Sequence, residues 1–347
     1  MNGPPRGGEI IARTLRRLLP IILIVAALWF FRGELDPAAA LAHLRDAAVM
    51  PLILAALCAV ASLVAMAEVM RVLLAAGGTH VTLRQTTALT FAANAFSTSF
   101  PGGAAISTVM QFQVMRRWKA SPLLISWFIV FSGALSTMWL IALSVGAVTF
   151  QPGSMLAPLV GLAALAGAMW WATNHPEPVA RFVRVALPLV LRAARRVMLR
   201  LGPLRHRAPV VDASVDTVTT HIYQLEAVRL TKSRFGWAAC CSLCNWLFDA
   251  ATLGLTLWAV TDVAPAPGAI LLTFITAKIV GSTNLTPGGL GPVEGALVGT
   301  LIATGVHSPD ALGAVILYRL ISLAMITALG WVVYAFSPWR SMAARAE

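Results

Sequence analysis

The chain has 347 residues, of which 58% are hydrophobic and only 12% are charged. Its mean hydropathy of +0.79 is far above what a water-soluble domain carries, so we exclude a soluble fold. The formal net charge of +12 does not indicate nucleic-acid binding, because the basic residues lie in short segments between apolar runs, where positive charge sets membrane orientation.

Six apolar runs are long enough to cross roughly 30 Å of hydrocarbon at about 1.5 Å per helical residue. They cover residues 15–31, 47–70, 121–150, 155–172, 236–260 and 310–336. In the first run the uninterrupted apolar part, 18–31, follows Arg13, Arg16 and Arg17, as in a signal sequence, but it ends without a small-residue cleavage site. We therefore expect an all-α integral membrane protein with about six transmembrane helices, the first of them uncleaved.

Two further apolar stretches are each broken near the middle by the triplet Pro-Gly-Gly. Residues 85–115 and 267–306 are interrupted at Pro101-Gly102-Gly103 and at Pro287-Gly288-Gly289. The halves of the first stretch are too short to cross separately, whereas the halves of the second would suffice for two crossings. The breaks predict two helical hairpins, either re-entrant or paired.

Orientation follows from the positive-inside rule. The first broken stretch lies between Arg84 and Arg116, which puts both its ends in the cytoplasm, and the second lies between Asp262 and Asp310, which puts both its ends outside. Segments 47–150 and 236–336 then match as helix, broken hairpin, helix in opposite orientations, which is an inverted repeat. We expect a single domain, 1–347, in the cytoplasmic membrane with both termini inside.

The segment between the halves, residues 174–235, interleaves arginines with Val, Leu and Met. One interpretation is an amphipathic helix lying on anionic lipid, where each basic residue contributes about 1 kcal/mol. The other is a solvated cytoplasmic connector whose charges only enforce topology.

Five charged residues fall within apolar segments: Glu68, Asp249, Lys278, Glu294 and Arg319. A charge at the bilayer centre costs about 2.5 to 3.5 kcal/mol, so each should face a cavity or a partner. A surface ion pair with Arg71 explains Glu68. Asp249 and Lys278 could pair with each other or act on a substrate. Arg319 has no charged neighbour in its own helix and is the strongest candidate for binding a substrate.

The residues at the second break are of the types that can form an anion-binding site. Pro287 is expected to end the first half-helix, and Gly288, Gly289 and Gly291 would let backbone N–H groups turn toward a ligand. The second half-helix then offers its positive N-terminal end to an anionic group. Glu294 could pair with Arg319, exchange a proton, or be purely structural.

The first break, at Pro101, Gly102 and Gly103, is flanked by neutral polar residues, including Asn94, Thr98 and Gln111. With the two triplets superposed, Thr108 falls where Glu294 stands, so the halves share a pattern but not charge. A hydroxyl-rich half facing an ionised half suggests an amphiphile's head group between them. Alternatively, the Ser and Thr residues only cap and join the broken helices.

Metal or cofactor binding is not expected. The cysteines, which are Cys58, Cys240, Cys241 and Cys244, lie inside apolar stretches, and the histidines are scattered through loops without metal-ligand spacing. Cys241 and Cys244 form a CxxC that we interpret as small apolar filling rather than a redox pair.

Residues 286–294 followed by Gly305-Val306 resemble the membrane domain of the lysylphosphatidylglycerol synthase/flippase family. Supporting matches are Asn245-Trp246 with Asp249, Tyr318-Arg319-Leu320, and Pro101-Gly102-Gly103 with Arg116-Arg117. The resemblance implies a membrane protein that moves a lipid or a lipid-linked head group between leaflets. Family members that also synthesise aminoacylated lipid carry a soluble C-terminal domain, and this chain stops eleven residues after Phe336, so synthase activity is not implied.

The leading hypothesis is therefore a flippase or scramblase in which Arg319, Lys278 and the broken helix ends hold a lipid phosphate. The expected partners are membrane lipids, either an anionic phospholipid or a polyprenyl-phosphate-linked lipid, together with a second copy of the chain or a lipid-synthesis enzyme. The alternatives are a membrane-embedded transferase acting on a lipid-linked substrate, and a non-transporting accessory subunit. No P-loop is present to bind ATP.

Overall fold

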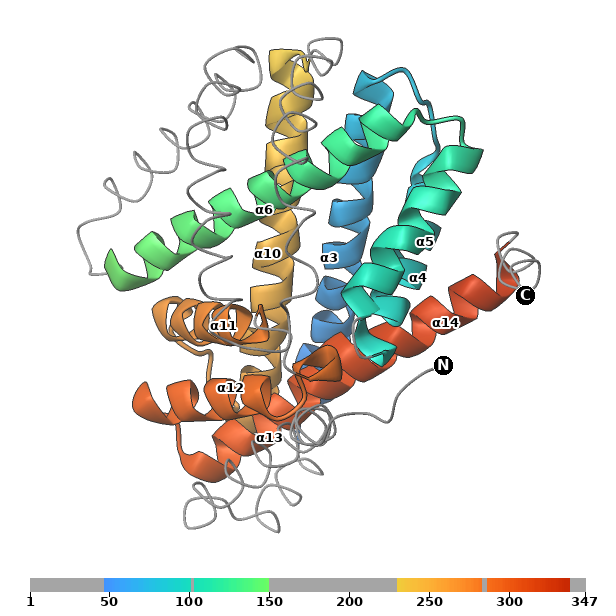
Figure 1. Cartoon of the computed structure of the whole chain (residues 1–347). Coiled ribbons are helices and arrows are strands. Elements are labelled where there is room, and N and C mark those ends of the chain that lie inside the picture. The colour runs from blue at the N-terminus through green and yellow to red at the C-terminus, as the bar shows by residue number, and fades with distance from the viewer. Residues whose placement is uncertain (1–46, 101–102, 150–229, 283–285, 338–347) are drawn as a thin grey trace, which may run out of the picture.

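The structure of the protein, a computed structural model, describes residues 47–100, 103–149, 230–282 and 286–337. All regular structure within these ranges is helical (Figure 1), which confirms the all-α class. The helices are α3 (Val49–Ala76), α4 (Leu83–Ser99), α5 (Gly103–Arg117), α6 (Pro122–Thr149), α10 (Lys232–Thr261), α11 (Pro267–Gly281), η3 (Pro287–Gly289), α12 (Pro292–Ala303), α13 (Ser308–Arg319), η4 (Leu320–Met325) and α14 (Ile326–Phe336).

Four helices in the described ranges are long and apolar enough to cross a membrane: α3, α6, α10 and the continuous rod formed by α13, η4 and α14. They confirm four of the six predicted spans, although α3 runs six residues beyond the expected end at Met70. The predicted spans 15–31 and 155–172 lie outside the described residues, as does nearly all of the connector 174–235.

The two broken stretches form two pairs of short helices. Helices α4, α5, α11 and α12 have 17, 15, 15 and 12 residues. At about 1.5 Å per residue they reach roughly 18 to 26 Å, which is no more than the shortest of the predicted spans. Helices α11 and α12 are thus shorter than the two full crossings that the sequence of the second stretch would allow.

Each break ends its first helix differently. Helix α4 stops at Ser99, and Phe100 is extended (φ −118°, ψ 145°), as a residue before proline prefers. Helix α11 stops at Gly281, so the prediction that Pro287 ends it is wrong. The Ser282 hydroxyl donates to the Ile279 carbonyl (2.6 Å) and opens the polar run Ser282-Thr283-Asn284, residue types that compete with helical hydrogen bonding.

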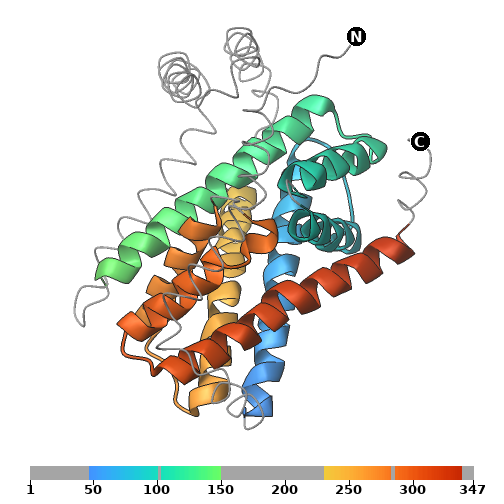
Figure 2. The same ribbon diagram turned by 60° about the horizontal axis from the view of Figure 1, so that its bottom comes forward.

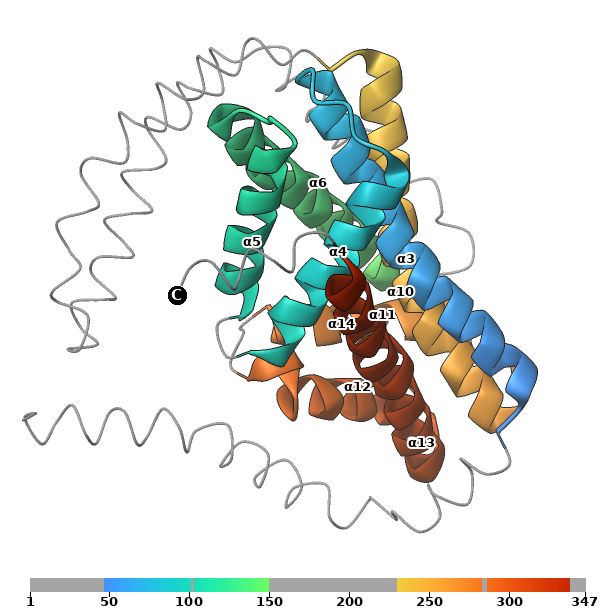
Figure 3. The ribbon, with the colours of Figure 1, turned by 90° about the vertical axis from the view of Figure 1, so that its right-hand side faces the viewer.

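Helices α3 and α10 lie side by side (Figure 3) and run antiparallel. Three polar contacts join them at matching seven-residue steps: the Ala48 N–H donates to the Ala259 carbonyl (2.9 Å), the Thr252 hydroxyl to the Ala55 carbonyl (3.4 Å), and the Ser62 hydroxyl to the Asn245 carbonyl (3.0 Å). Small side chains along this seam let the two backbones approach, as is usual between membrane helices.

The remaining described helices pack against this pair and against one another. Figure 2 shows α6 (green) and the α13–η4–α14 rod (red) as long oblique helices with the orange α11 and α12 between them. Helix α14 packs on α4, where Gly330 is essential for the close approach, because a Cβ there would lie 2.3 Å from the Phe91 carbonyl oxygen. In the other broken stretch, helix α11 packs on the long helix α6.

Candidate functional site

A cavity of about 640 Å³ lies where helices of both halves meet. Asn94, Ser97 and Thr98 of α4 line one side, and Asp249 of α10, Lys278 of α11 and Arg319 of α13 line the other, together with Gly288 and Gly289 of η3. The structure therefore brings together seven of the predicted site residues: Asn94, Thr98, Asp249, Lys278, Gly288, Gly289 and Arg319.

Arg319 connects the last helix to the second break. Its Nε lies 2.5 Å from Glu294 Oε1 in an ion pair, and its Nη2 donates to the Gly288 carbonyl at 2.5 Å. The two side chains are only 15% and 28% exposed, so this pair is largely withdrawn from water. Of the alternatives that the sequence left open for Glu294, the pairing with Arg319 is present.

The N-terminus of α12 is partly occupied by the protein itself. Glu294 Oε2 accepts the Gly291 N–H at 2.6 Å, so a carboxylate in the first helical turn already satisfies one free backbone donor. This differs from the expectation of an open helix end facing a ligand. The backbone of Gly288 (φ 60°) and Gly291 (φ 94°) is left-handed, a conformation that glycine adopts without a steric penalty.

The second ion pair joins α10 to α11. Lys278 Nζ lies 2.6 Å from Asp249 Oδ2, and the other carboxylate oxygen accepts the Tyr318 hydroxyl at 2.9 Å. The ammonium also lies over the rings of Phe274 and Trp246, at 4.8 and 5.5 Å from their centroids. Lys278 occupies the last turn of α11, where the helix dipole favours a positive charge.

Tyr318 was missed as a site residue by the sequence reasoning. It is buried and donates to Asp249 across 69 residues of sequence. Its position next to Arg319 was visible, but nothing local indicates which way the hydroxyl points.

The first half contributes only neutral groups. The Thr98 hydroxyl lies 2.9 Å from that of Thr327 and also donates to the Asn94 carbonyl at 2.9 Å. Gly103 begins α5 and is buried tightly against α4, because a Cβ there would lie 2.4 Å from the Phe96 carbonyl oxygen. Pro101 and Gly102 lie outside the described residues, and for Pro287 only the backbone is described.

Gln111 faces a neighbouring compartment rather than the cavity itself. This compartment has about 370 Å³ and lies between α3, α4, α5 and α6. Asn94, Ser97 and Ser136 line both spaces, so the two adjoin.

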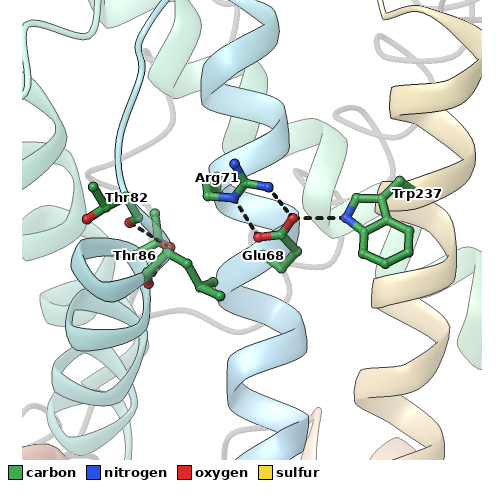
Figure 4. Close-up of polar contacts among 6 residues, drawn as sticks. Glu68, Arg71, Thr82, Thr86 and Trp237 are labelled. Atoms are coloured by element: carbon green, nitrogen blue, oxygen red, sulfur yellow. Dashed lines mark hydrogen bonds and ion pairs between the residues drawn. The ribbon is translucent and has the colours of Figure 1, made fainter.

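Glu68 lies away from the cavity, in a three-membered cluster shown in Figure 4. Arg71 donates two N–H groups to its carboxylate, at 2.6 and 2.5 Å, and the Trp237 indole N–H donates to the same carboxylate at 2.9 Å. The predicted ion pair is present, but Glu68 is buried rather than at the surface as expected. With the indole, the pair satisfies Glu68 without a ligand.

All four cysteines carry free thiols, including both members of the CxxC. Across the ranges that the structure describes, no three His, Cys, Asp or Glu side chains gather closely enough to hold a metal ion.

Comparison with known proteins gives two matches. The family model described as the lysylphosphatidylglycerol synthase TM region matches residues 17–330, which include every candidate site residue. A UPF0104 membrane protein of Methanothermobacter thermautotrophicus is 28% identical over 142 residues. That alignment covers 39% of this chain and 42% of the relative, less than half of either.

Proposed function

Because this chain belongs to the family of the lysylphosphatidylglycerol synthase transmembrane region, and is therefore a multi-pass membrane protein, we propose that it translocates a lipid. The substrate is a phospholipid or a lipid-linked phosphate, and the membrane is the cytoplasmic membrane. The head group passes through the cavity while the tails stay in the bilayer.

The observation that carries this proposal is the pair of ion pairs on one wall of the cavity. Arg319 lies eleven residues after the start of α13 at Ser308, about 16 Å into the helix and so near the middle of a bilayer roughly 30 Å thick. Charges at that depth are costly, and membrane proteins keep them where they bind or move something. Two cations at this depth suit a phosphate.

Each carboxylate has a second donor that would hold it if its cation turned to a ligand. Glu294 keeps the Gly291 N–H and the positive end of α12, and Asp249 keeps the Tyr318 hydroxyl. A phosphate oxygen can thus replace a carboxylate on Arg319 or Lys278 without leaving that carboxylate bare. This exchange of partners would offset much of the cost of removing a phosphate from water.

The helix packing supports an inverted repeat of segments 47–150 and 236–336. Helix α3 contacts α4 as α10 contacts α11, α4 contacts α14 as α6 contacts α11, and α5 contacts α6 as α12 contacts α13. The corresponding helices α3 and α10 run antiparallel. We take this as the arrangement of the whole membrane domain, with six spans, both termini in the cytoplasm, and 174–235 as its cytoplasmic connector.

Leaflet exchange in proteoliposomes tests the function. Fluorescent phospholipids and a fluorescent polyprenyl phosphate are incorporated, and the rate at which an external reductant quenches them is measured for wild type, Arg319→Ala and Glu294→Gln. Wild type should exchange at least one lipid, and folded Arg319→Ala should lose about tenfold or more of that rate, as expected for one charge-assisted hydrogen bond.

The matched control is Gly236→Ala in α10, where a Cβ meets nothing within 4 Å. It should exchange lipid like wild type. Exchange of no lipid by wild type, even with an imposed proton gradient, would overturn the proposal.

A further inference from the structure

The compartment beside the cavity differs from it in chemistry. Its polar lining comes from Thr90, Asn94, Ser107, Thr108, Gln111 and Ser132, with other Ser residues and apolar side chains between them. None of the described residues that line it is charged. The cavity itself, by contrast, is lined by Asp249, Lys278 and Arg319.

Three of the hydroxyl groups that line the compartment already donate their hydrogen to the protein. Thr90, Thr108 and Ser132 donate to carbonyls of their own helices, at 2.9, 2.8 and 3.3 Å. Their lone pairs remain for a ligand. Gln111 donates to the Ser107 hydroxyl at 3.3 Å and keeps its carbonyl oxygen as a further acceptor.

This lining discriminates between kinds of head group. A phosphate needs cations or several donors, and the lining is richest in acceptors. An ammonium group would leave water without a carboxylate to pair with, which is costly in a membrane. Ligand O–H groups fit best, because each donates to one lone pair and can accept from an amide of Asn94 or Gln111.

Two residues of the lining, Thr108 of α5 and Gly133 of α6, are exposed, so the compartment reaches the surface of the molecule. Near them in the sequence, Val109 and Val130 are 57% and 71% exposed. Exposed apolar residues beside a polar compartment suit a ligand whose polar head enters from the bilayer.

From these features we propose that the translocated lipid carries an uncharged, polyhydroxylated group, a sugar or polyol, on its phosphate. The phosphate binds at Arg319 and Lys278, and the hydroxyl groups bind in the adjoining compartment. Its volume of about 370 Å³ is that of a small-ligand site. This inference rests on the proposed function and names its substrate class.

The test compares fluorescent lipids with the same tails and different heads in one set of proteoliposomes. Phosphatidylinositol carries a polyol on its phosphate, phosphatidic acid carries only the phosphate, and phosphatidylethanolamine carries an ammonium group. Wild type should exchange phosphatidylinositol about tenfold faster than the other two, since a site built for hydroxyl groups discriminates against lipids that lack them.

Variants locate the preference. Thr108→Val and Gln111→Leu remove acceptors from the compartment and should bring the ratio of phosphatidylinositol to phosphatidic acid exchange toward one. Gln113→Leu makes the same chemical change on an exposed residue of α5 outside the compartment, and should keep the wild-type ratio. A ratio unchanged in Thr108→Val and Gln111→Leu would overturn the assignment.

The outcomes of this experiment distinguish failure of the polyol assignment from failure of the proposed lipid translocation. Equal wild-type exchange of all three lipids, or a preference for phosphatidylethanolamine, overturns the polyol class and leaves translocation standing. Exchange of none overturns both. Uptake of soluble inositol phosphate into the same vesicles would show that the polyol is moved without tails, and would overturn the lipid assignment.

Discussion

The two Pro-Gly-Gly segments start from the same three residues and lead into different structures. After Pro101 the next helix begins at once, at Gly103, whose N–H donates to the Phe100 carbonyl. After Pro287 the chain makes a 3-10 turn and continues to Pro292 before α12 begins. Three residues, 100–102, separate the first pair of helices, and ten, 282–291, separate the second.

The residues at the equivalent positions 108 and 294 follow this difference. The Thr108 hydroxyl stays on its own helix and donates to the Ala104 carbonyl, whereas Glu294 reaches back to Gly291 and across to Arg319. A longer break leaves more backbone groups in need of partners, and charged side chains supply them. The ionised half of the site is thus the half with the more open backbone.

The largest expected effect comes from breaking the Arg319–Glu294 pair. Arg319→Ala removes the charged partner of the largely buried Glu294 and leaves it only the Gly291 N–H and the end of α12, so the free energy of unfolding should fall by about 3 to 5 kcal/mol. Thermal or denaturant unfolding in detergent micelles measures the loss. The double variant Arg319→Met with Glu294→Gln leaves no unpaired charge and should recover much of the stability. Equal losses in the single and double variants would contradict coupling of the two residues.

The second ion pair should be the next most sensitive. Asp249→Asn keeps the shape of the side chain but removes the charge opposite Lys278, so we expect a loss of about 1.5 to 3 kcal/mol. Tyr318→Phe removes one hydrogen bond to the same carboxylate but leaves its ion pair with Lys278, and should cost about 1.5 kcal/mol, the low end for a bond to a charged group. Unfolding of both variants and of their combination gives the coupling energy. A larger loss in Tyr318→Phe than in Asp249→Asn would reverse this ranking.

Glycine-to-alanine substitutions allow the two breaks to be compared directly. At Gly103 a Cβ would press on backbone carbonyls of α4, so Gly103→Ala should cost about 1 to 3 kcal/mol by forcing the helices apart. At Gly288 the Cβ would press only on the flexible end of Leu323, at 3.0 Å, and would lie in ordinary contact with the Thr98 carbonyl oxygen at 3.5 Å. The cost therefore comes from the left-handed backbone, about 1 to 2 kcal/mol. Apparent melting temperatures rank the two variants, with Gly236→Ala as the unstrained reference. A Gly288→Ala protein as stable as wild type would show that the left-handed turn is not required.

The smallest effect is expected in the hydroxyl-rich half. Thr98→Val removes the contact with Thr327 between α4 and α14 and should cost about 1 kcal/mol, because both partners are neutral. A double-mutant cycle with Thr327→Val isolates that contact. A cost comparable to that of Arg319→Ala would abolish the contrast between the two halves.

Length and apolar content were enough to predict four spans and both breaks, and the isolated charges left the two ion pairs as one of the alternatives for each pair of residues. The length of an apolar run and the free-energy cost of a charge in the bilayer can both be judged from the sequence without knowing the fold. Asp249, Lys278, Glu294 and Arg319 needed partners at membrane depth, and the helices carrying them bring those partners together.

The features that the sequence did not reveal depend on packing between distant segments. Nothing local indicates that Tyr318 donates to Asp249, or that the backbone becomes π-helical at Leu320–Met325, immediately after Arg319. The early end of α11 at Gly281 was missed because Pro287 is the more obvious helix breaker, while Ser282 already offers its hydroxyl to the last turn.

The seven-residue spacing of contacts between α3 and α10 limits how the two halves can move. The three contacts share one register, so any slide along this seam would separate Ala48, Ala55 and Ser62 from their partners together. Such a slide has no compensating contact with water inside a membrane. For the translocation proposed above, we therefore expect helices α3 and α10 to rotate about this seam rather than slide along it.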